Sequence, residues 1–74
     1  MDELLEHLRD IRDDVDFGNE TELIDGKILT SFDIIQIIAM LDDEYDIAIP
    51  ANEIVPKNFN SAEAILALIE RLKG

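Results

Sequence analysis

A pair of hydroxyl residues, Thr30 and Ser31, stands directly before a run of apolar and acidic residues. Thr30 and Asp33 fit a capping box, in which the Thr hydroxyl accepts the Asp amide N–H and the carboxylate accepts the Thr amide N–H. This pattern predicts a helix that begins at Ser31, with the Ser hydroxyl exposed beside free backbone amides. An anion attached there would be stabilised by those amides and by the helix dipole. The residue type alone also fits a simple cap, which is the commoner role of Ser at a helix start.

Catalytic chemistry is not expected of this chain. His7 is the only histidine, and no acid, thiol or second histidine pairs with it at a recognisable spacing. Ser31 also lacks a His or Lys base at a spacing typical of an activated nucleophile. We therefore expect a protein that is not an enzyme.

A calcium loop deserves a test, because acids stand at its first, third, fifth and twelfth positions: Asp42, Glu44, Asp46 and Glu53. The Gly that such a loop requires is replaced by Ile47, and Pro50 stiffens its middle. We therefore expect no metal site.

Composition limits the possible functions. The chain has 74 residues, no Cys, and 18 acidic against 6 basic residues, which give a formal charge of −12. One domain spanning residues 1–74 with one small core is expected. Nucleic acid is excluded as a favoured partner because its phosphates would be repelled, whereas a basic protein surface would be attracted.

The N-terminus lacks the basic flank and apolar run of a signal peptide, and no apolar stretch approaches the roughly 20 residues that cross a bilayer. We expect a soluble, cytoplasmic monomer that does not enter the membrane.

Apolar periodicity predicts an all-α fold, a small bundle of three main helices plus one short helix. The first helix is expected from Asp2 to about Asp14. A long loop over residues 16–30 follows, pinned to the core by apolar side chains: Phe17, Leu23, Ile24, Ile28 and Leu29. A brief helical turn is expected near residues 51–55, ending before Pro56. The last helix is predicted to open with an Asn60–Glu63 cap, to bury Ala64, Ile65, Leu68, Ile69 and Leu72, and to stop at Gly74.

The second helix, which ends in acids before Ile49 and Pro50, has two faces on a helical wheel. Its predicted core stripe is Ile34, Ile38, Leu41 and Tyr45, flanked by Ile35 and Ile37. Its predicted exposed side is Phe32, Asp33, Gln36, Ala39, Met40 and Asp43. Phe32 and Met40 are large apolar residues edged by acids on that side, which favours a protein-docking surface.

The order of these elements resembles that of acyl carrier proteins and the carrier domains of polyketide and peptide synthases. The resemblance covers essentially the whole chain, and its most specific stretches are ILTSFDIIQIIAMLDDEYDIAIP, residues 28–50, and NFNSAEAILALIERL, residues 58–72. It implies that Ser31 carries a covalent 4′-phosphopantetheine arm, whose thiol holds an acyl or aminoacyl group as a thioester. Thr30 stands where the family has Asp.

The resemblance also implies partners: a phosphopantetheinyl transferase and acyl-transferring, condensing or ligase enzymes with basic docking patches. With the helical wheel, it predicts one partner surface made of Phe32, Asp33, Gln36, Ala39, Met40, Asp42 and Asp43. Two hypotheses follow. One is a carrier protein in fatty acid, polyketide or related biosynthesis; the other is an unmodified acidic module with the same fold that binds a basic protein. The large Ile side chains of the second helix predict a narrow internal cavity.

Overall fold

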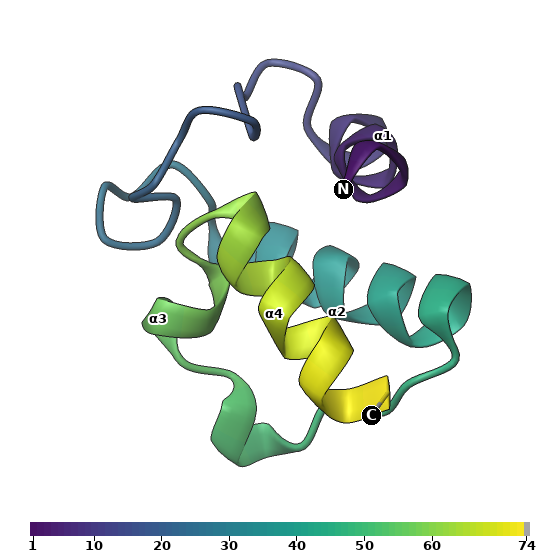
Figure 1. Cartoon of the computed structure of the whole chain (residues 1–74). Helices are drawn as coiled ribbons and strands as arrows, with labels where there is room; N and C mark the ends of the chain where they lie inside the picture. Colours follow the sequence, from purple (N-terminus) through teal and green to yellow (C-terminus); the bar gives the residue numbers. More distant parts are fainter. Residues whose placement is uncertain (74) are drawn as a thin grey trace.

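The computed structural model describes residues 1–73, which form an all-helical bundle with no strand among them. Its elements are α1 (Asp2–Ile11), α2 (Ser31–Tyr45), a 3₁₀ turn η1 (Ala51–Glu53), α3 (Pro56–Phe59) and α4 (Ala62–Lys73). Helix α1 packs against α2 and α4, and α3 packs against α4 (Figure 1). The predicted bundle of three main helices and a short one is confirmed.

Helix α1 ends at Ile11, three residues before the predicted end at Asp14. Arg12 already has an extended backbone, and its side chain turns to bind Asp14 and Asp33. Asp13 and Asp14 would have added negative charge to the negative end of the helix. The acids and the Arg12 contacts together explain the early stop.

The connection over residues 12–30 is pinned to the core, as predicted. Phe17, Leu23 and Leu29 are buried, while Ile24 and Ile28 are half-buried against them. Leu23 begins a compact turn, because its carbonyl accepts the amide N–H groups of both Ile28 and Leu29. The long loop is therefore an ordered part of the fold.

The phase of helix α2 differs from the predicted core stripe. Ile37 is fully buried together with Leu41, whereas Ile34, Ile38 and Tyr45 are only half-buried. Ile35, expected to flank the core, is 64% exposed. The buried face is thus rotated from the predicted stripe toward Ile37.

The C-terminal part differs from the prediction in the role of Pro56, in the cap of α4 and in the burial along α4. Pro56 begins α3 as its first residue, where its missing N–H costs nothing, instead of only ending the preceding turn. Helix α4 is capped by Ser61, whose Oγ accepts the Ala64 amide at 3.0 Å, and the predicted Asn60–Glu63 cap is wrong. Within α4, Ile65, Leu68 and Ile69 are buried as predicted and Ala62 is buried with them, whereas Ala64 and Leu72, also predicted to be buried, are only half-buried. The predicted stop at Gly74 lies outside the described residues.

Candidate functional site

The capping box at the start of α2 fixes the backbone of Ser31. Thr30 Oγ1 accepts the Asp33 amide at 3.2 Å, and Asp33 Oδ2 accepts the Thr30 amide at 3.0 Å. Thr30 is extended and Ser31 is the first helical residue, with an exposed side chain. The predicted cap and the predicted exposure of Ser31 are both confirmed.

Asp33 is only 6% exposed, so its predicted place on the exposed side of the helix is wrong. Arg12 Nη1 donates to Asp33 Oδ2 at 2.6 Å, and the same guanidinium binds both carboxylate oxygens of Asp14 at 2.8 and 2.9 Å. Arg12 Nη1 also lies 3.4 Å from the Ile28 carbonyl oxygen. Asp33 therefore ties the end of α1 to the start of α2.

These contacts shift the ionisation of both acids. The hydrogen bond from the Thr30 amide, helped by Arg12 and opposed by burial, lowers the pKa of Asp33 below its ordinary value. The hydrogen bonds from Arg12 lower the pKa of Asp14 to about 2. Asp33 is thus held as a carboxylate that is paired with Arg12 and has little exposure to solvent.

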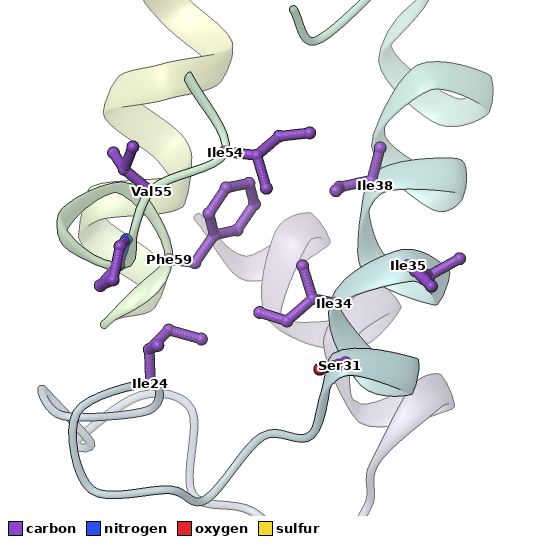
Figure 2. Close-up of a pocket in the computed structure, with 9 residues that line it drawn as sticks. Ile24, Ser31, Ile34, Ile35, Ile38, Ile54, Val55 and Phe59 are labelled. Carbon is purple, nitrogen blue, oxygen red and sulfur yellow. The ribbon is translucent and has the colours of Figure 1, made fainter. Parts of the chain in front are cut away.

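An apolar cavity of about 390 Å³ opens beside Ser31. Ile34, Ile35 and Ile38 line it from α2, Phe59 lines it from α3, and Ile24 comes from the 12–30 connection. Ile54, Val55 and Pro56 complete the lining. Figure 2 shows Ile34 and Phe59 facing each other across the cavity, with Ser31 and Ile24 at the same edge. Ser31 supplies the only polar side chain of this lining.

A polar network holds the wall formed by η1 and α3. The buried Asn58 donates through Nδ2 to the Glu53 backbone carbonyl at 2.7 Å and to Glu53 Oε1 at 3.1 Å. Arg71 of α4 donates to Asn58 Oδ1 at 3.3 Å and lies 3.6 Å from Glu53 Oε1. The short segment that carries Ile54 is therefore fastened to α4, which keeps this side of the cavity in place.

The exposed face of α2 keeps part of the predicted partner surface. Phe32 is 68% exposed, and Ala39, Asp42 and Asp43 are also exposed, whereas Gln36 and Met40 are half-buried and Met40 packs against the core. Ile35 belongs to this face but was not predicted to. Its residue type did not distinguish it from the core residues, because Ile34, Ile37 and Ile38 are isoleucines as well. The exposed face is defined here as Phe32, Ile35, Ala39, Asp42 and Asp43.

His7 lies far from Ser31. Its ring packs edge-on against Tyr45 with centroids 6.1 Å apart, and its Nε2 lies 3.4 Å from Glu44 Oε2. Tyr45 is 14 residues along α2 from Ser31, or about 21 Å at the rise of an α-helix. His7 therefore cannot act as a base for the Ser31 hydroxyl. Burial, with the nearby charges of Glu3 and Glu44, raises the pKa of Tyr45.

Over residues 1–73, no group of three or more His, Asp or Glu side chains is arranged to hold a metal ion. No helix in that range has both the length and the apolar character needed to span a bilayer.

Comparison of the chain with models of known protein families and with curated proteins found no match.

Proposed function

We propose that this protein is a carrier protein similar to acyl carrier proteins, with 4′-phosphopantetheine attached to Ser31. One observation carries the proposal: an exposed hydroxyl at the first residue of α2 lies at the edge of an apolar cavity of about 390 Å³. That volume is near the lower end of the range for small-molecule pockets, roughly 300–1,000 Å³. A cavity of this size suits an apolar group tethered at its edge and swung between the protein and a partner enzyme.

The attachment would be made by a transferase, with this chain supplying the nucleophile. Ser31 Oγ would displace adenosine 3′,5′-bisphosphate from the pyrophosphate of coenzyme A, forming a phosphodiester and losing the hydroxyl proton. The new phosphodiester anion would lie at the N-terminus of a 15-residue helix, where free amides and the helix dipole stabilise negative charge. Thr30 preserves the helix start through the same cap that an Asp would form.

Intact mass spectrometry tests the proposal. Purified wild-type protein incubated with a phosphopantetheinyl transferase and coenzyme A is expected to gain one phosphopantetheinyl group, and Ser31→Ala is expected to gain none. Ser61→Ala is the matched control, because it removes another helix-start serine and should still be loaded. No addition to the wild type, or equal addition to Ser31→Ala, would refute the carrier function.

A second candidate is an unmodified module that binds a basic protein through the exposed face of α2. It is favoured by two large apolar side chains on that face, Phe32 and Ile35, which are 68% and 64% exposed and are followed along the helix by Asp42 and Asp43. An apolar patch edged by acid suits a basic partner. Thr30, where the carrier family has Asp, is the sequence feature that prompts this alternative.

The two candidates make different predictions for one binding experiment. A basic amphipathic helical peptide serves as the probe, and its affinity is measured for wild type, Ser31→Ala and Phe32→Ser. The module predicts binding that survives Ser31→Ala, weakens with salt and is reduced by Phe32→Ser. Loss of binding in Ser31→Ala, or affinity that is independent of salt, would contradict it.

A further inference from the structure

The side chain of Asn60 holds the turn that carries Ile24. Asn60 Oδ1 accepts the amide N–H groups of Ile24 and Asp25, each at 3.0 Å, and Asn60 Nδ2 donates to Asp25 Oδ2 at 3.1 Å. The Asn60 backbone carbonyl accepts the Leu23 amide at 2.9 Å. Four hydrogen bonds therefore connect residues 23–25 to a single residue more than thirty positions later. We call this set the Asn60 clamp.

Asn60 is free to make the clamp because it does not cap α4. That cap comes from the next residue, Ser61, whose side chain accepts the Ala64 amide. Two adjacent residues thus have separate structural roles: Ser61 starts a helix, and Asn60 binds a distant turn. This separation makes Ser61 a natural control for any effect of Asn60.

Ile24 connects the clamp to the cavity. Of the residues that line the cavity beside Ser31, it alone comes from the 12–30 connection. Its backbone N–H is one of the two that Asn60 Oδ1 accepts, and its side chain lies at the same edge of the cavity as Ser31 (Figure 2). Leu23, the fully buried residue before it, anchors the turn from the core side. The position of this wall therefore depends on contacts made by Asn60.

We propose that Asn60 is a positioning residue: by holding Ile24 in the cavity wall, it determines how much of an apolar chain tethered at Ser31 is buried. This inference rests on the proposed carrier function, since the natural tethered chain would be the cargo. The clamp sets the gain in stability that each added methylene of the chain brings. The loss of the clamp leaves the wall open to water and reduces that gain.

The absence of cysteine from the sequence allows a direct test. Ser31→Cys provides one thiol at the edge of the cavity, and alkyl methanethiosulfonates of increasing length attach chains to it as disulfides. The series is made in the Ser31→Cys parent and in parents that also carry Asn60→Ala or Ser61→Ala. Urea unfolding then gives the folding equilibrium constant for each chain length.

In the Ser31→Cys parent, the equilibrium constant should rise by up to about fourfold for each buried methylene until the cavity is full. We call the logarithm of this rise per methylene the increment. Asn60→Ala should at least halve the increment. Ser61→Ala should weaken the protein without a chain, as loss of a helix cap does, but should leave the increment unchanged. A flat series in the parent, an unchanged increment in Asn60→Ala, or an equal reduction in Ser61→Ala would overturn the proposal.

Ile24→Ala provides a second test, and the measurement on this single variant does not require Asn60→Ala to fold. Truncation of Ile24 removes the wall directly and should reduce the increment as Asn60→Ala does. Adding Asn60→Ala to Ile24→Ala should then cause little further reduction, because both changes act on one wall. An unchanged increment in Ile24→Ala, or independent and additive reductions, would overturn the role assigned to Asn60.

The failure of this inference can be distinguished from the failure of the carrier function. The alkyl series uses no transferase and no coenzyme A, whereas the carrier function is tested by loading of the wild type. A wild-type protein that is never loaded, together with the expected alkyl series, would refute the carrier function and keep the Asn60 clamp. A loaded wild type with an alkyl series unaffected by Asn60→Ala would refute the clamp alone.

Discussion

Asp33→Asn tests the structural role of Asp33. The substitution keeps the shape of the side chain and an oxygen that can accept the Thr30 amide, but it removes the charge that binds Arg12 at 2.6 Å. Hydrogen bonds to charged groups contribute about 1.5–3 kcal/mol, and the Arg12 side chain is 28% exposed, so water can replace part of the contact. We therefore expect a loss of about 1–2 kcal/mol in the free energy of unfolding.

Urea and thermal unfolding at pH 7, followed by circular dichroism, measure this loss. For a domain of this size it corresponds to a fall in Tm of roughly 4–16 °C. Asp43→Asn is the matched control, because it removes the same charge from an exposed position on the same helix. Asp43 is in the last turn of α2, near the negative end of the helix dipole. Removal of its charge should therefore leave the free energy of unfolding unchanged or raise it slightly.

The loss should also depend on pH in a defined direction. Because the pKa of Asp33 is lower in the folded protein than its ordinary value of 3.8, its ionised form contributes stability that is fully present well above pH 3.8. That contribution disappears as the pH falls through the lower, folded pKa. The difference between wild type and Asp33→Asn should therefore be constant from pH 7 to 5 and shrink below about pH 4. Equal effects of Asp33→Asn and Asp43→Asn, or a difference that persists unchanged in acid, would refute this reasoning.

Three further predictions are checked by the same unfolding measurement. A Cβ on Gly26 would lie 2.6 Å from a backbone carbonyl oxygen, so Gly26→Ala should cost more than about 1 kcal/mol, whereas Gly18→Ala, whose Cβ meets nothing closer than 3.9 Å, should be neutral or stabilising. Equal losses at the two glycines would contradict the role of that close approach. Asp46 has a left-handed φ of 52° after the last turn of α2, where Asn is favoured and a negative charge is not. Asp46→Asn should therefore raise the free energy of unfolding by about 0.3–1 kcal/mol, and a destabilised variant would contradict this. Ile37 is buried and Ile35 is exposed, so Ile37→Ala should lower the free energy of unfolding by about 2–5 kcal/mol and Ile35→Ala by less than about 1 kcal/mol. The reverse order would contradict the burial of Ile37 in the core.

The parts of the fold that depend on nearby residues could be predicted from the sequence. The three main helices follow from apolar periodicity, and the start of α2 follows from a capping box whose partners are three residues apart. The anchoring of the 12–30 connection follows from its scattered large apolar residues. The exposure of Ser31 was predicted in this way because it depends only on the start of the helix, whereas its role as an attachment point was implied by the resemblance to acyl carrier proteins.

The phase of α2 could not be predicted because its apolar residues are too many. Isoleucine occupies four of five consecutive positions, from Ile34 to Ile38, so a helical wheel offers several equivalent buried stripes. The choice is made by α1, which packs against α2 from another part of the chain. Ile37 therefore reaches the core, and Ile35 is left on the surface.

The roles of Asp33 and Asn60 could not be predicted because their partners are distant in the sequence. The helical wheel placed Asp33 on the exposed side, but the structure buries it, and its carboxylate is paired with Arg12, 21 residues earlier. The sequence pattern predicted Asn60 as the cap of the last helix. In the structure its side chain instead accepts the amides of Ile24 and Asp25, which no local pattern identifies, and Ser61 caps the helix. Pro56 was ambiguous for a different reason: the same residue type ends one helix and begins another.

The burial of Asp33 changes the expected geometry of any partner that approaches Ser31. Of the three acids predicted for the partner surface, only Asp42 and Asp43 stay exposed, and Asp43 is 12 residues, or about 18 Å, along α2 from Ser31. That distance exceeds the Debye length of about 10 Å at 0.1 M salt, so these charges act only weakly at the hydroxyl itself. Close to Ser31 the exposed face offers Phe32 and Ile35 instead. For the proposed carrier function, a matching partner would therefore have its basic patch about 18 Å from the site that receives the proposed Ser31 arm, with an apolar contact in between.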